Sequence, residues 1–135
     1  MENPPEVNAA GLSPALWAYL GDALHELAVR EYLLAGKKYS TTGALHREAI
    51  RLVKAENQAR LLQLLAEEFT PEEKEILRRG RNQKSGHIPA HTDPVTYRHS
   101  TAWEGLLGYL YLTGRKERVK SLLGKAIEAL EKNLP

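Results

Sequence analysis

The sequence contains no cysteine, one methionine and one phenylalanine. The absence of cysteine excludes a disulfide framework and thiolate-bound metal sites, and it is compatible with a reducing cytosol. No stretch approaches the roughly 18 to 20 consecutive apolar residues of a membrane span, and the N-terminal MENPPEVNAAG has neither a basic start nor an apolar run. We therefore expect a soluble cytoplasmic protein with no membrane partner.

Charge of one sign is also scarce, since the formal net charge is only +2. This balance does not indicate a nucleic-acid partner by itself, so any electrostatic argument depends on where the charges lie. With 135 residues, of which 42% are hydrophobic, the chain has enough apolar surface for one globular core. We expect a single domain over residues 1–135, with residues 1–11 as a flexible N-terminus.

Apolar residues recur at helical spacing along the chain, and neither strand alternation nor an internal repeat is present. Ser13-Pro14 is an N-cap with proline at the first helical position, so a helix is expected over about 14–34, with Gly36 as its C-terminal cap. Thr70-Pro71-Glu72-Glu73 forms a capping box that predicts a short helix ending near Gly80.

The remaining segments complete an all-helical prediction. Residues 41–69 predict one long helix or two helices with a break near Ala55, whereas 82–94 contain glycine, prolines and no apolar period, which is typical of a loop. Helical spacing resumes at Thr96 and stops at Gly114, and an amphipathic helix closes the chain. The fold class is therefore all-α, a helical bundle.

One helix carries an unexpected Gly21-Asp22 in its interior. Glycine costs roughly 1 kcal/mol relative to alanine there, so we expect the missing side chain to admit another backbone. The helix at 100–113 carries Gly105 and Gly108, and a tight crossing of the two helices would bring Glu104 near Asp22. Such carboxylates suit Mg²⁺, with Mn²⁺ as an alternative. A solvated acidic face and simple core packing remain alternatives.

Two further groups of residues are candidates for chemistry. The segment RRGRNQKSGHIPAHTDPVTYRH gathers five cations against a single acid, which suits phosphate contacts, although short basic runs are also commonly just solvated. The predicted RNA-binding residues are Arg78, Arg79, Arg81, Lys84 and Arg98. The five histidines show no metalloprotease spacing, so we expect them on the surface, and no cysteine or serine pattern supports covalent catalysis.

Three segments, YLGDALHELAVREYLL, LRRGRNQKSG and YRHSTAWEGLLGYLYL, together resemble the catalytic domain of the ribonuclease III family, in order across nearly all of residues 12–113. Leu20 to Ala23 is similar to the family's signature helix, and Glu104 with the following Gly-Leu-Leu-Gly is similar to the helix that supplies its second key acid. No double-stranded-RNA-binding domain follows, which resembles the short form of the family.

The resemblance implies an all-α ribonuclease III-like endonuclease domain, a homodimer, and Mg²⁺-dependent hydrolysis of double-stranded RNA to 5′-phosphate and 3′-hydroxyl ends. For the short form it also implies maturation of large-subunit (23S) ribosomal RNA from its precursor, with a ribosomal protein as a possible presenting partner. Asp22 and Glu104 carry over as catalytic metal ligands.

Two of the family's four acids are missing, since Ala18 and Thr101 stand at their positions. Glu26, one turn after Asp22 on the same helical face, is a candidate replacement ligand, and an ion pair with Arg30 is the alternative for it. The missing acids also leave open a non-catalytic duplex-RNA-binding ribosome-assembly factor of the same fold. A helical dimerisation module without an RNA partner is a third hypothesis.

Overall fold

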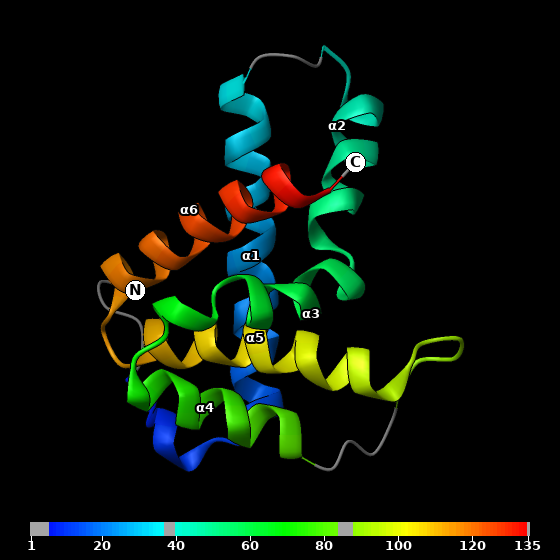
Figure 1. Cartoon of the computed structure of the whole chain (residues 1–135). Helices are drawn as coiled ribbons and strands as arrows, with labels where there is room; N and C mark the ends of the chain where they lie inside the picture. Colours follow the sequence, from blue (N-terminus) through cyan, green and yellow to red (C-terminus); the bar gives the residue numbers. More distant parts are fainter. Residues whose placement is uncertain (1–5, 37–39, 84–87, 135) are drawn as a thin grey trace.

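A computed structural model describes residues 6–36, 40–83 and 88–134, and within these ranges the chain is helical, with no strand (Figure 1). This confirms the predicted fold class. Short 3-10 helices lie at Ala9–Gly11 and Ala66–Glu68. The α-helices are α1 (Pro14–Gly36), α2 (Thr42–Val53), α3 (Ala55–Leu64), α4 (Pro71–Asn82), α5 (Pro94–Leu112) and α6 (Lys116–Asn133).

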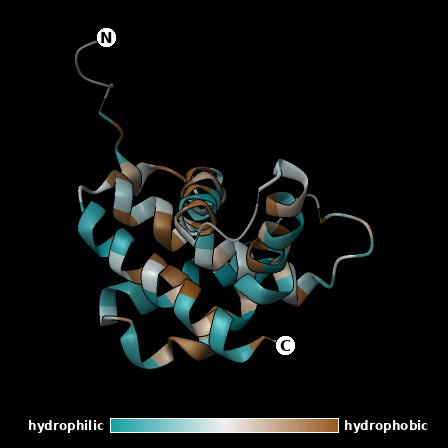
Figure 2. Ribbon diagram, turned by 90° about the horizontal axis from the view of Figure 1, so that it is seen from above, coloured by the Kyte–Doolittle hydropathy of each residue, from teal (hydrophilic) through white to brown (hydrophobic). Residues whose placement is uncertain are grey.

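Helix α5 is the centre of the bundle. Figure 1 shows it running across the molecule, with α4 alongside it and α1 crossing it, and both helices pack against it. Its side chains Trp103, Leu106 and Leu107 are completely buried, and most residues from Ala102 to Leu110 are buried as well. Viewed from above, hydrophilic and hydrophobic residues alternate along the surrounding helices, as expected of amphipathic elements (Figure 2).

The predicted break in the second helical region lies at Lys54, one residue before the expected position. Lys54 has extended backbone angles (φ −65°, ψ 148°), so α2 and α3 are separate helices. Two amide side chains at the start of α3 reach back across the break: Asn57 Nδ2 donates to Arg51 O at 2.6 Å, and Gln58 Nε2 donates to Val53 O at 2.7 Å. These bonds satisfy carbonyls at the end of α2 that its own helix leaves free.

Helix α4 begins as predicted but ends later. Both hydrogen bonds of the Thr70–Glu73 capping box are present, at 3.1 and 3.0 Å. The prediction that the helix ends near Gly80 is wrong by two residues, since α4 continues to Asn82. A Cβ at Gly80 would lie 2.8 Å from the Ala102 Cα, so this glycine serves a close α4–α5 contact instead of a helix end.

The described part of the N-terminal segment is tied to α1. Ala9 is buried, and its carbonyl accepts a 2.7 Å hydrogen bond from Trp17 Nε1. Every helix within the described ranges is too short or too polar to cross a lipid bilayer.

Candidate active site

Helices α1 and α5 meet backbone to backbone, as the interior glycines predict. A Cβ at Gly21 would lie 1.7 Å from the Glu104 carbonyl oxygen, and a Cβ at Gly108 would lie 1.9 Å from the Trp17 carbonyl oxygen. Each helix thus supplies one glycine that faces a carbonyl of the other. Gly105, the other glycine expected at this crossing, has only ordinary contacts, 3.5 Å to its nearest atom.

This crossing places Asp22 and Glu104 together. The Asp22 residue is exposed and the Glu104 residue is half-buried, and their carboxyl groups are within hydrogen-bonding contact. Burial, followed by the hydrogen bond to Asp22, raises the pKa of Glu104 to about 9. At neutral pH and without a cation, Glu104 is therefore protonated and donates to Asp22.

A third polar group, missed by the sequence analysis, reaches the same place from α3. The Gln58 side chain lies within hydrogen-bonding reach of Glu104, and the residue is only 3% exposed. Its Oε1 atom is buried and has no hydrogen-bond partner among the described residues. A lone glutamine after a helix start carries no recognisable sequence pattern, so only the packing of α3 on α5 reveals it.

Glu26, the proposed replacement ligand, has a partner of its own. Its Oε2 accepts a 3.0 Å hydrogen bond from Arg30, the pairing expected under the alternative interpretation. Among residues 6–36, 40–83 and 88–134, no three Asp, Glu, His or Cys side chains are grouped to hold a metal ion. The structure thus brings Asp22 and Glu104 together without a third acid.

His25 is not on the surface, contrary to the sequence-based expectation. It is completely buried, its Nδ1 accepts a 3.0 Å hydrogen bond from Trp103 Nε1, and its Nε2 lies 2.9 Å from Leu52 O. Because the indole can only donate, the Nε2–H must donate to Leu52, and the imidazole is neutral. Desolvation accordingly lowers the pKa of His25. This bridge fixes α1 to α5 close to Asp22 and Glu104, so His25 is structural.

The predicted basic residues fall into two groups. Arg78 forms an ion pair with Glu75 (2.6 Å), and Arg79 lies over the Trp17 ring at 5.0 Å, so both make intramolecular contacts. Arg81 and Arg98 form no ion pair within the described part of the chain and lie near His99, whose pKa is lowered first by burial and then by these two charges. Lys84 lies outside the described residues. The end of α4 and the start of α5 thus form one basic patch, defined here as Arg81 of α4 and Arg98 of α5, both near His99.

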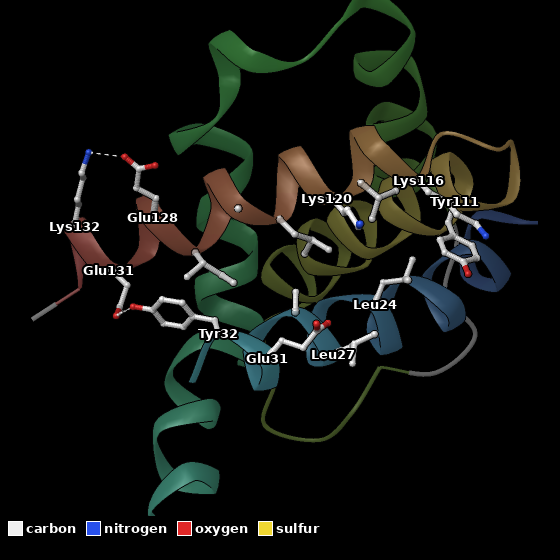
Figure 3. A pocket seen from close by; sticks show the side chains of 15 residues that line it. Leu24, Leu27, Glu31, Tyr32, Tyr111, Lys116, Lys120, Glu128, Glu131 and Lys132 are labelled. Carbon is white, nitrogen blue, oxygen red and sulfur yellow. Dashed lines mark hydrogen bonds and ion pairs between the residues drawn. The ribbon is translucent and has the colours of Figure 1, made fainter. Parts of the chain in front are cut away.

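A groove of about 760 Å³ lies between α1 and α6 (Figure 3). Its lining is mainly apolar, including Leu24, Leu27 and Ile127, while Tyr32 donates a 2.5 Å hydrogen bond to Glu131 at its edge. Neither Asp22 nor Glu104 lines it. The carboxyl pair is therefore separate from this groove.

The donor set at the α1–α5 crossing fits a divalent cation of the Mg²⁺ type. Two carboxyl groups in contact repel each other when both are ionised, so they require either a shared proton or a cation. All the available ligands are oxygen atoms, which Mg²⁺ and Mn²⁺ prefer, and no sulfur or imidazole ligand accompanies them among the described residues. Asp22 and Glu104 are the residues that would hold the ion.

A family model and named relatives of this chain indicate the same protein family. A family model described as "Ribonuclease III domain" matches residues 16–115. The protein named Mini-ribonuclease 3 from Symbiobacterium thermophilum is 44% identical over 125 residues, covering 93% of this chain and 95% of that protein. Mini-ribonuclease 3 from Staphylococcus aureus is 42% identical, covering 94% and 96%. A crystal structure of a Fusobacterium nucleatum protein aligns with a TM-score of 0.76 at 27% identity, covering 87% of this chain and 93% of that one.

Proposed function

Because this chain belongs to the ribonuclease III family of endoribonucleases, we propose that it hydrolyses double-stranded RNA with Mg²⁺ held by Asp22 and Glu104. The observation that carries the proposal is the contact between these two carboxyl groups across the α1–α5 crossing. The products would be duplex ends with 5′-phosphate and 3′-hydroxyl groups.

The chain's own residues contribute positioning and proton release. The reciprocal glycine contacts hold Asp22 and Glu104 at a fixed separation, so the ligands need little rearrangement. Glu104 must lose its proton before it can bind a cation, and the Asp22 carboxyl group beside it would supply a second oxygen ligand. Once bound, Mg²⁺ supplies a Lewis acid that activates water and offsets charge on the phosphate.

RNA binding would use the basic patch of Arg81 and Arg98. A-form RNA is recognised mainly through its shape, phosphates and 2′-hydroxyl groups, and arginine suits phosphate contacts. Arg98 lies on α5, the helix that also carries Glu104, so a duplex bound to the patch would run toward the carboxyl pair. The proposed RNA-binding surface would also include three cations close to Arg81 in the sequence, namely Arg78, Arg79 and Lys84.

A homodimer is supported by the exposed face of α1. Four large apolar residues on it are 52 to 84% exposed, namely Leu16, Tyr19, Leu27 and Leu34. A row of this kind is typical of a surface covered by a partner. A twofold dimer would present two equivalent sites to the two strands of a duplex, which are themselves related by a local twofold axis.

We propose a cytoplasmic role in maturing large-subunit (23S) ribosomal RNA from its precursor, with a ribosomal protein as a candidate presenting partner. Incubation of the purified protein with a precursor transcript, with and without large-subunit ribosomal proteins, tests this substrate. Accumulation of unprocessed precursor on depletion of the protein in cells is the matching result.

Cleavage of an end-labelled duplex with and without Mg²⁺ tests the activity itself. Asp22→Asn and Glu104→Gln should each abolish cutting and leave duplex binding and circular dichroism nearly unchanged. Glu31→Gln, which neutralises another exposed acid of α1, is the matched control and should cut like the wild type.

The same assay separates the alternatives. Mg²⁺-dependent cutting that both variants abolish supports the enzyme. A gel shift without cutting supports the non-catalytic RNA-binding factor, a hypothesis that the missing acids at Ala18 and Thr101 favour. A protein that neither binds nor cuts RNA would be a helical dimerisation module.

A further inference from the structure

Gln58 is a buried polar residue with an incomplete set of hydrogen bonds. The residue is 3% exposed, and Nε2 donates one hydrogen to Val53 O at 2.7 Å. A primary amide has two donors and an acceptor, and an unsatisfied buried polar atom destabilises the folded state. Its Oε1 nevertheless has no partner among the described residues. Gln58 therefore has one N–H and its carbonyl oxygen left for further contacts.

The contact with Val53 fixes which way the amide faces. If oxygen and nitrogen exchanged places, Oε1 would lie 2.7 Å from the Val53 carbonyl oxygen, a repulsive contact between two acceptors. With Nε2 held there, the second N–H is free to donate, and the Glu104 carboxyl is the group within its reach.

From this geometry we propose that Gln58 is a positioning residue for Glu104 in the cation site: its second N–H holds the carboxyl group in the orientation that binds the metal. The inference rests on the proposed function of Asp22 and Glu104 as metal ligands. It assigns α3, which carries neither acid, a part in building the site.

A neutral amide suits this position better than a third acid. Asp22 and Glu104 already repel each other when ionised, and an additional carboxylate would increase that repulsion. An amide donor stabilises the charged form of Glu104 without adding charge. The unpartnered Oε1 is available to accept from water, and Mg²⁺ keeps several water molecules when it binds proteins.

The test compares two neighbouring amides. Gln58→Met keeps the side-chain length and removes the amide, and Asn57→Leu removes the equivalent hydrogen bond to Arg51 O without touching Glu104. Both variants lose one bond across the α2–α3 break, so their stabilities in urea should fall by similar amounts. Binding of Mn²⁺ alone is measured by titration calorimetry on the full chain.

We expect Gln58→Met to weaken Mn²⁺ binding about tenfold, as the loss of a residue that orients a ligand typically does. Asn57→Leu should change it less than twofold. The milder Gln58→Asn, whose shorter amide cannot reach both Val53 and Glu104, should give an intermediate loss and serves if Gln58→Met does not fold. Equal affinities in the Gln58 variants and Asn57→Leu would overturn the proposal.

Failure of the proposed function gives a different pattern. A wild-type protein that binds Mn²⁺ but does not cut duplex RNA refutes the nuclease activity, and the affinity ratios still decide the role of Gln58. A wild-type protein that binds no Mn²⁺ refutes the metal site, and the assignment of Gln58 with it.

Discussion

Substitution of Gly21 by alanine tests whether α1 and α5 really touch through their backbones. The added Cβ would lie 1.7 Å from the Glu104 carbonyl oxygen, whereas ordinary contacts of a Cβ begin at 3.4 Å. The neighbour is main chain inside a helix and cannot rotate away. The two helices therefore have to separate by well over an ångström at this point.

Two opposing effects set the magnitude. Alanine improves helix propensity by about 1 kcal/mol, but forced separation of closely packed elements typically costs 1 to 3 kcal/mol and sometimes more. Here the contacts around the completely buried Trp17 and Trp103 would also loosen. We expect Gly21→Ala to lower the free energy of unfolding by about 2 to 4 kcal/mol.

Urea denaturation followed by circular dichroism measures this difference, with Gly124→Ala as the control. Gly124 also lies inside a helix, but no atom of another described part of the chain is within 4 Å of its Cβ position, so alanine should stabilise the protein by about 0.4 to 1 kcal/mol. If Gly21→Ala matched Gly124→Ala in stability, the backbone contact would not exist. Gly21→Ala should also bind Mn²⁺ more weakly than the wild type, since separation of the two helices moves Asp22 away from Glu104.

Four other predictions follow from individual residues. Glu104→Gln should raise the free energy of unfolding at pH 8 in metal-free buffer by roughly 1 to 3 kcal/mol. Because the pKa of Glu104 is about 9, the folded wild type keeps a proton that the unfolded chain loses above about pH 4.5, so wild-type stability falls as the pH rises from 4.5 to 9. Equal pH profiles of stability for the two proteins would exclude this pKa shift. Glu73→Ala, which removes half of the capping box and an ion pair to Arg118, should cost about 2 to 4 kcal/mol in urea, and a loss within error of zero would contradict the contacts. Glu26→Gln should leave the Mg²⁺ concentration for half-maximal cleavage unchanged, because Glu26 pairs with Arg30 and does not join Asp22 and Glu104; a clear rise in that concentration would place Glu26 in the site. Arg81→Glu should weaken duplex binding for all sequences and reduce the slope of log affinity against log salt by about 1; an unchanged slope would mean that this arginine contacts no phosphate.

The sequence was most informative where a residue is unfavourable in its own helix or is explained by its neighbours in sequence. Glycine inside a helix is unfavourable unless something approaches it, so Gly21 and Gly108 predicted a close crossing, and the crossing in turn placed Asp22 beside Glu104. The capping box at Thr70 was equally reliable because its hydrogen bonds involve neighbours in sequence.

The sequence was least informative where a role depends on distant residues. His25 is buried because Trp103 and Leu52, from two other helices, supply its hydrogen bonds, and no spacing in α1 indicates them. Gly80 has the same explanation, since its contact with Ala102 comes from α5. Gln58 enters the site only through the packing of α3, so its contribution could not be read before the helices were assembled.

The reciprocal contacts of Gly21 and Gly108 have a consequence for the choice of ion. If α1 or α5 slid along the other helix, a residue with a side chain would replace Gly21 or Gly108 opposite a backbone carbonyl and would clash with it. The distance between the backbones that carry Asp22 and Glu104 is therefore hard to change. Adjustment to a different ion radius is left to side-chain rotation alone. Ca²⁺ needs six to eight oxygen ligands at 2.3 to 2.6 Å in an adaptable cage, which two acids on a locked frame do not provide. Calcium should therefore be a poor substitute for the smaller magnesium and manganese ions, and the discrimination would originate in two residues that have no side chain.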